Sequence, residues 1–217
     1  MIKIKEICGK YNLILLEDSA QAIGSYYNKK HGGSFGLSGS FSCHPLKNLN
    51  ALGDGGFMIT DNDEVAKKVN LYRNHGLESR DNAVIFGVNS RLDNLHAEVL
   101  KFRLRRLKSV ISRRRKNAEL YRRIINTDRI RIPEEKTSQG YTDSYVMFLV
   151  YAENRDNLKE YLKSKDIETM VYYGTPLHLQ KASQKYNNPL GSFPIAENLC
   201  KKVLALPINQ NLSSNQI

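Results

Sequence analysis

The chain has 217 residues, with 33 Lys and Arg against 22 Asp and Glu, which gives a formal net charge of +11. Its 41% hydrophobic and 25% charged residues form an ordinary globular composition, which excludes collagen, coiled coils and wholesale disorder. No uncharged apolar run approaches the roughly 20 residues of a membrane helix, and the first residues lack the apolar core of a signal peptide. Three widely spaced cysteines without a C-x-x-C pair argue against a disulfide framework or a metal site and favour a cytoplasmic protein.

The densest basic run lies between residues 103 and 123, on a strongly helical stretch. Such a run is typical either of a polyanion-binding surface or of a helix face that is solvated or salt-bridged. No aromatic interleaving and no nucleic-acid-binding motif accompanies it, so nucleic-acid binding is the less favoured interpretation.

Hydrophobic periodicity and turn residues predict alternating strands and helices. In chain order we expect a helix (3–12), strands (13–16, 41–43, 57–60), a helix capped by Asp61 or Asn62 (to about 74), a long helical region broken once (92–126), a strand (145–151), a helix (155–165), a strand (168–172) and a helix with Pro near its start (194–204). The alternation indicates an α/β chain with a mostly parallel sheet early and a smaller α+β unit late.

Two apolar patterns predict what is buried. The continuous run at 13–16 is typical of a strand buried on both faces. Leu92, Leu95, Val99 and Phe102 recur at helical spacing and predict an apolar face on the long helical region. Both ends of the chain look cut, since the first predicted strand has no preceding segment to supply its neighbours.

Three short segments hold the unusual polar residues: 17–24, 40–49 and 86–93. Each is weak evidence alone. A carboxylate after a strand is often a turn residue, a lysine after a proline is usually solvated, and Asn89 or Ser90 before a helix reads as a cap. Together they fit pyridoxal 5′-phosphate (PLP), which needs a lysine to bind it as a Schiff base, a carboxylate for its pyridine nitrogen and donors for its phosphate.

The same segments resemble the DegT–StrS family of PLP-dependent nucleotide-sugar aminotransferases. The resemblance rests on "LLEDSAQAIG" through "FSCHPLKNLNALGDGG", then "LYRNHGL", "FGVNSRLDNLHAEVL", "YGTPLHLQ" and "FPIAENLCKKVLALPI", in the family's order. It implies an α/β fold of the fold type I PLP-transferases. Residues 1–115 would be the C-terminal part of the large, mixed or parallel-sheet domain, and residues 116–217 the small α+β domain.

By resemblance, Lys47 matches the lysine that joins the cofactor and moves protons. Asp18 matches the acid paired with the pyridine nitrogen, Gln21 the glutamine at the ring hydroxyl, and Ser42 a serine at the phosphate. Asn89 matches an asparagine that reaches the phosphate in the neighbouring subunit.

Two further residues of these motifs have less specific counterparts. Arg91 is expected near the subunit interface and His178 on the substrate side. Lysine at position 47, where some relatives carry a histidine and dehydrate the sugar, indicates the transaminating branch.

The resemblance implies transamination of a nucleotide-linked keto-sugar with glutamate or glutamine as the amino donor, in deoxyamino-sugar or polysaccharide biosynthesis. It also implies a homodimer with shared active sites. Family members are longer, with the missing part expected mainly before Met1, so we expect this chain to be inactive alone. The alternatives are a non-catalytic subunit that pairs with a full-length paralogue and a basic polyanion-binding protein.

Overall fold

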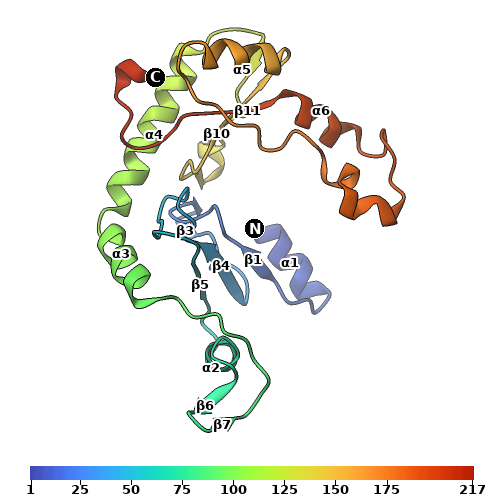
Figure 1. Cartoon of the computed structure of the whole chain (residues 1–217). Coiled ribbons are helices and arrows are strands. Elements are labelled where there is room, and N and C mark those ends of the chain that lie inside the picture. The colour runs from blue at the N-terminus through green and yellow to red at the C-terminus, as the bar shows by residue number, and fades with distance from the viewer. The chain divides into compact units, whose positions relative to one another are not determined.

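The computed structural model describes residues 1–217 and divides into two compact units (Figure 1). The first unit comprises residues 1–112 and 136–146, and the second comprises 113–135 and 147–217. The short segment 136–146 therefore leaves the second unit and contributes to the first. The boundary expected near residue 115, between the large and the small domain, stays a prediction.

The main sheet of the first unit is mixed and has the order β1-β4-β5. β1 (Leu16–Asp18) pairs with β4 (Ser38–Ser42) in parallel, and β5 (Gly56–Ile59) pairs with β4 antiparallel. The predicted strands at 41–43 and 57–60 are confirmed, and the α/β class with a mixed sheet holds.

The prediction that the run at 13–16 is a strand buried on both faces is wrong for this chain. Only Leu16 of that run lies in β1, and Leu13, Ile14 and Leu16 are 58%, 73% and 65% exposed. Helix α1 (Ile2–Lys10), which precedes the run, has no buried residue. The physical reason is that β1 packs mainly against its neighbour β4 and no helix covers its faces, so these side chains stay exposed.

The helices that follow the main sheet confirm two predictions. α2 (Asp63–Tyr72) begins after Asn62, whose side chain accepts the Val65 N–H. The long helical region is broken once, between α3 (Asn94–Leu104) and α4 (Leu107–Ile124). From residue 113 onward α4 belongs to the second unit.

The apolar face predicted for this region is confirmed only in part. Leu92 packs against the core cluster and Val99 is half-buried, but Leu95 and Phe102 are exposed, and the buried residue of α3 is Leu100. The first unit has one core cluster of buried residues: Ile23, Phe41, Cys43, Leu49, Ala51 and Leu100.

Short strands of two or three residues escaped the sequence analysis, because periodicity needs a longer run to be visible. The hairpin of β2 (Tyr26–Tyr27) and β3 (Lys30–His31) gains β9 (Tyr141–Thr142) as a third strand on β2. β6 (Leu77–Ser79) and β7 (Asn82–Ala83) form a second hairpin.

The second unit contains an antiparallel sheet of order β11-β10-β8. Its elements are β8 (Ile130–Arg131), β10 (Phe148–Ala152), α5 (Arg155–Lys163), α6 (Pro194–Lys202) and β11 (Val203–Leu206), with short 3₁₀ turns between α5 and α6. The helices at 155–165 and 194–204 are confirmed in position. The strand predicted at 168–172 is reduced to one bridge between Met170 and Ala205, and β11 was not predicted. Phe148, Val150 and Leu204 are almost fully buried.

Candidate functional site

The parallel pair β1 and β4 brings two predicted site residues to the same end of the main sheet. Asp18 is opposite Ser40 in the register, and the Ser19 N–H donates to the Ser40 carbonyl at 2.8 Å. Ser42 ends β4 two residues further on. Because carboxyl ends of parallel strands form the ligand-binding edge of open α/β sheets, Asp18 and Ser42 stand at the edge expected for a ligand.

Lys47 lies on a loop that begins directly after β4 and is closed by backbone hydrogen bonds. The Ala51 N–H donates to the Cys43 carbonyl, and the Cys43 N–H donates to the Gly55 carbonyl, both at 2.7 Å. Within the loop the Lys47 N–H donates to the His44 carbonyl at 2.8 Å, and Ser42 Oγ accepts the His44 N–H at 3.2 Å. These hydrogen bonds fix the backbone at Lys47. The residue is half-buried, so its side chain remains accessible.

Two side chains that the sequence analysis missed anchor the lysine loop to other segments: Asn48, within the loop, and Arg103, outside it. Asn48 is buried and donates from Nδ2 to the Ser144 carbonyl at 2.8 Å, while its Oδ1 has no hydrogen-bond partner. Arg103 of α3 donates from Nη1 to the carbonyls of Asn50 and Ala51. The position of Asn48 next to Lys47 was the only sequence signal for this role. Its hydrogen-bond partner is Ser144, and no local sequence pattern connects residue 48 with residue 144.

Gln21 and the Asp18 side chain are both exposed at the end of β1. Asp18 Oδ1 accepts the Ala20 N–H at 3.0 Å, which orients the carboxylate in a tight turn. Asp18, Gln21, Ser42 and Lys47 thus come from one end of two paired strands and the segments that follow them.

Asn89 does not contact these four residues. It forms an isolated bridge with Asn74, and its Oδ1 accepts Arg91 Nε at 3.2 Å, while Arg91 Nη1 donates to Asn74 Oδ1 at 3.2 Å. Neither Asn89 nor Ser90 is the cap of α3, which is Asp93. The interpretation of Asn89 or Ser90 as a cap is therefore wrong, and Asn89 remains an exposed amide held by Arg91.

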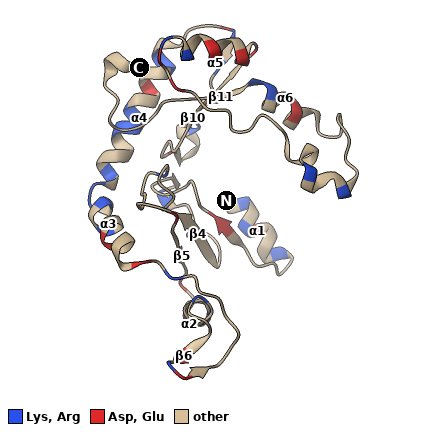
Figure 2. Cartoon of the chain, in the orientation of Figure 1, with Lys and Arg blue, Asp and Glu red and all other residues tan.

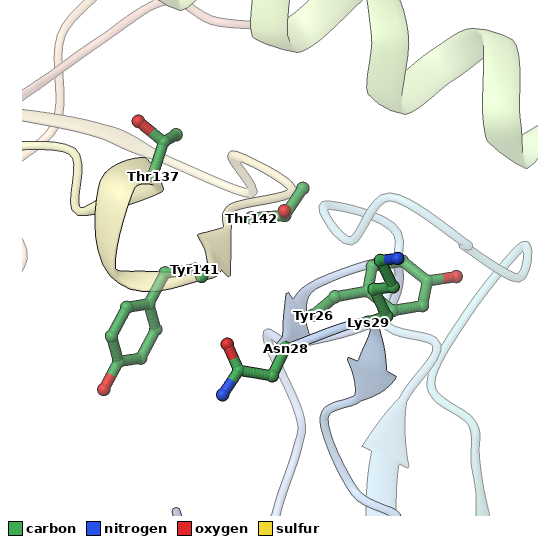
Figure 3. Close-up of a pocket in the computed structure, with 7 residues that line it drawn as sticks. Tyr26, Asn28, Lys29, Thr137, Tyr141 and Thr142 are labelled. Atoms are coloured by element: carbon green, nitrogen blue, oxygen red, sulfur yellow. The ribbon is translucent and has the colours of Figure 1, made fainter.

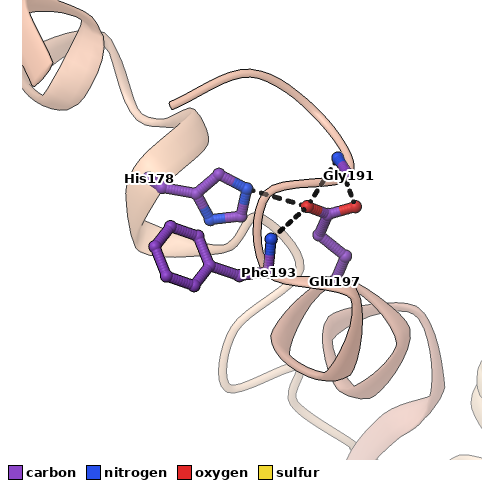
Figure 4. Close-up of polar contacts among 4 residues, drawn as sticks. All are labelled: His178, Gly191, Phe193 and Glu197. Atoms are coloured by element: carbon purple, nitrogen blue, oxygen red, sulfur yellow. Dashed lines mark hydrogen bonds and ion pairs between the residues drawn. The ribbon is translucent and has the colours of Figure 1, made fainter. Parts of the chain in front are cut away.

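His178 lies in the second unit, where Figure 4 shows it facing Glu197. Its Nε2 is 3.0 Å from Glu197 Oε1, and the two side chains are 8% and 10% exposed. The same carboxylate accepts the N–H groups of Gly191 and Phe193, and the His178 ring packs at 4.8 Å from the Phe193 ring. Burial alone would raise the pKa of Glu197, but these N–H donors and His178 hold it below its ordinary value.

An open pocket of about 560 Å³ in the first unit lies beside the β2–β3 hairpin (Figure 3). Its lining residues come from the hairpin and from the segment around β9: Tyr26, Asn28, Lys29, Thr137, Gly140, Tyr141 and Thr142. None of the predicted site residues lines it, so the pocket is distinct from the edge that carries Asp18 and Lys47.

The basic run along α3 and α4, visible in Figure 2, makes many contacts within the chain. Arg113 donates to the Gln210 and Leu212 carbonyls, and the buried Arg114 donates to the Gln210 side chain. Arg115 pairs with Glu135, and Arg122 donates to the Pro133 carbonyl. These guanidinium groups hold loops of the second unit, which favours a structural role for the run over a polyanion-binding one. Among the helices there is no stretch long and apolar enough to cross a bilayer.

Comparison with known proteins gives the family. Among curated relatives, the chain is 36% identical over 219 residues to the "Pleiotropic regulatory protein" of Geobacillus stearothermophilus, covering 100% of this chain and 58% of the relative. It is 37% identical to the dTDP-3-amino-3,6-dideoxy-alpha-D-galactopyranose transaminase of Aneurinibacillus thermoaerophilus, covering 100% of this chain and 59% of the relative.

A solved structure matches the fold in the same way. DesV from S. venezuelae, crystallised in complex with a ketimine intermediate, superposes with a TM-score of 0.92 at 34% identity, covering 98% of this chain and 57% of that one. The chain therefore spans somewhat more than half the length of the relatives it matches. All 217 residues match the family model, so the chain belongs to the DegT/DnrJ/EryC1/StrS aminotransferase family.

Proposed function

We propose that this chain supplies the lysine-bearing part of a PLP-dependent aminotransferase that acts on a nucleotide-linked keto-sugar. The observation that carries the proposal is the parallel pairing of β1 and β4, in which Asp18 is opposite Ser40 and the strand continues through Ser42 to the Lys47 loop. A carboxylate, a hydroxyl and a half-buried lysine at one sheet edge are the donor set that PLP requires, so the residues present fit this cofactor.

When bound, PLP supplies an electron sink for the carbon that gains or loses the amine. Lys47 would hold the cofactor covalently and move the proton at the reacting carbon as a base and then as an acid. Asp18 would accept the N–H of the pyridine ring and keep that nitrogen protonated. Its orientation by the Ala20 N–H supports this role, because a carboxylate already held in place loses less entropy on binding.

Three more residues have proposed binding roles. Ser42 would donate its hydroxyl hydrogen to the cofactor phosphate, which its acceptance of the His44 N–H leaves available. Gln21 would contact the ring hydroxyl. Asn89, which lies apart from these residues and is exposed, would serve the cofactor of a second subunit, and this supports a homodimer with shared sites.

For the substrate we propose a nucleotide-linked 3-keto-6-deoxy sugar, with glutamate or glutamine as the amino donor. Support comes from the relative of Aneurinibacillus thermoaerophilus, whose name specifies an amine at carbon 3 of a dideoxy sugar. We further propose that His178 supports the substrate side through the position of its loop, because its side chain is buried against Glu197. Three unpaired cysteines support a cytoplasmic location.

Borohydride trapping of PLP on the purified chain, followed by peptide mapping, tests the proposal. We expect the pyridoxyl label on Lys47 and its loss in Lys47→Ala. The matched control is Lys67→Ala, which removes an exposed lysine of α2 and should leave the label unchanged. Label scattered over surface lysines, or label that survives in Lys47→Ala, would show that the pocket does not capture the cofactor.

A further inference from the structure

The carboxylate of Glu17 is bound by three backbone N–H groups of the Gly-rich loop at residues 32–36. Oε2 accepts the Gly33 N–H at 2.8 Å, and Oε1 accepts the Gly36 N–H at 2.7 Å and the Phe35 N–H. Successive N–H groups of this kind form a concave anion site. In this protein the anion bound there is the Glu17 carboxylate, so the loop binds a side chain of β1.

The loop lies directly on the two paired strands. A Cβ on Gly36 would be 2.3 Å from the Leu15 carbonyl oxygen, and a Cβ on Gly39 would be 2.2 Å from the Gly33 carbonyl oxygen. Gly39 is also the residue opposite Glu17 in the β1–β4 register. The glycines therefore allow backbone to meet backbone, which is what brings the loop within reach of the Glu17 carboxylate.

Glu17 and Asp18 are neighbours on β1, and successive side chains of a strand point to opposite faces. Glu17 is held on one face by the loop. On the other side Asp18 Oδ1 accepts the Ala20 N–H, and the Ser19 N–H binds the Ser40 carbonyl. The loop continues into β4 after only Leu37, and β4 leads to Ser42 and the lysine loop. One side chain thus joins the strand that carries Asp18 to the segment that enters the strand carrying Ser42.

We propose that Glu17 is a positioning residue that fixes the orientation of the Asp18 carboxylate relative to Ser42 by clamping the Gly-rich loop across β1 and β4. It touches none of the reacting atoms and acts through the backbone of the strand end. The inference rests on the proposed function only in taking Asp18 and Ser42 as cofactor contacts.

The test is amide hydrogen exchange of the full 217-residue chain, without cofactor, in wild type and Glu17→Gln. Glutamine keeps one acceptor oxygen but presents an NH₂ group to an N–H donor, so the clamp is weakened without a loss of volume. We expect exchange at Gly33 and at Ala20, whose amide reports the Asp18 carboxylate, to accelerate together by about tenfold or more. Glu6→Gln, which makes the same charge change on the exposed face of α1, should change neither.

A second readout follows the cofactor. The apparent affinity for PLP, measured by borohydride-trapped label on Lys47, should fall about tenfold in Glu17→Gln, because a misdirected Asp18 loses a charge-assisted hydrogen bond. If wild type itself takes no label on Lys47, the proposed function fails, and hydrogen exchange still decides the role of Glu17.

Acceleration at Gly33 while Ala20 keeps its wild-type exchange rate would overturn the proposal, since the clamp would then not transmit to Asp18. If Glu17→Gln does not fold, native-state exchange of the wild type at low urea decides. Gly33, Gly36, Ser19 and Ala20 should then open with one free energy and one urea dependence, and separate openings would overturn the proposal.

Discussion

At the scale of single residues, three carboxylates in this chain are held by backbone N–H groups. Glu17 accepts three N–H groups, Asp18 accepts one, and Glu197 accepts those of Gly191 and Phe193 together with His178. Charge-assisted hydrogen bonds of this kind are directional, so they fix loops as well as stabilising charge. Adjacent acids in a sequence can therefore have separate tasks, as Glu17 and Asp18 do.

The Glu197 carboxylate predicts a pH dependence for the second unit. Its folded pKa is lowered, so its contribution to stability is present above the unfolded value of about 4.5 and is lost as the pH falls through the folded pKa. We expect Glu197→Gln to lower the melting temperature at pH 7 and to flatten the acid limb of the melting temperature against pH. Glu160→Gln, at an exposed position of α5, should leave that limb unchanged. An acid limb equal in all three proteins would contradict the assignment.

At the scale of elements, arginines of the basic run of α4 bind loop carbonyls and side chains and so hold those loops against the helix. Arg114 is 8% exposed, donates to Gln210 Oε1 at 3.2 Å, and has its pKa lowered by burial. The side chain thus combines the packing of its methylene groups with hydrogen bonding. A helix rich in Arg can therefore be basic in composition and still direct much of that charge inward.

Removing the Arg114 side chain tests this account of α4. Arg114→Ala should lower the free energy of unfolding by about 2 kcal/mol, because it removes the buried methylene groups of the arginine and the N–H donor to Gln210 Oε1. Lys116→Ala, an exposed position of the same helix, should change it by less than about 0.5 kcal/mol. Urea unfolding followed by circular dichroism measures both. Equal effects would mean that the Arg114 contacts are energetically neutral.

At the scale of the whole molecule, the division into two units predicts that core damage stays local. Val150 of β10 is 0% exposed, so Val150→Ala should cost about 2 kcal/mol. We expect faster hydrogen exchange in β10 and β11 and no change in β1 and β4. Val84→Ala, at a 46% exposed position of the first unit, is the control. Equal acceleration of both sheets would show that the units unfold as one.

The sequence by itself determined the α/β class, the positions of the longer helices, a helix cap at Asp61 or Asn62 and the residue types needed for PLP, because propensity, capping and motif chemistry are local. It did not determine which apolar residues are buried. Leu13 to Leu16 read as a core strand, yet burial depends on which segments pack against β1.

Only the tertiary structure decided what joins distant residues. In the folded chain β1 pairs with β4, and Asn48 donates to the Ser144 carbonyl. His178 is buried against Glu197, and the N–H groups of the Gly-rich loop donate to the Glu17 carboxylate. Each of these contacts connects segments separated by many residues, where backbone register and close glycine packing set the distance. The physical reason is that the sequence specifies which groups a side chain carries, whereas the folded backbone determines which other groups lie within hydrogen-bonding distance of it.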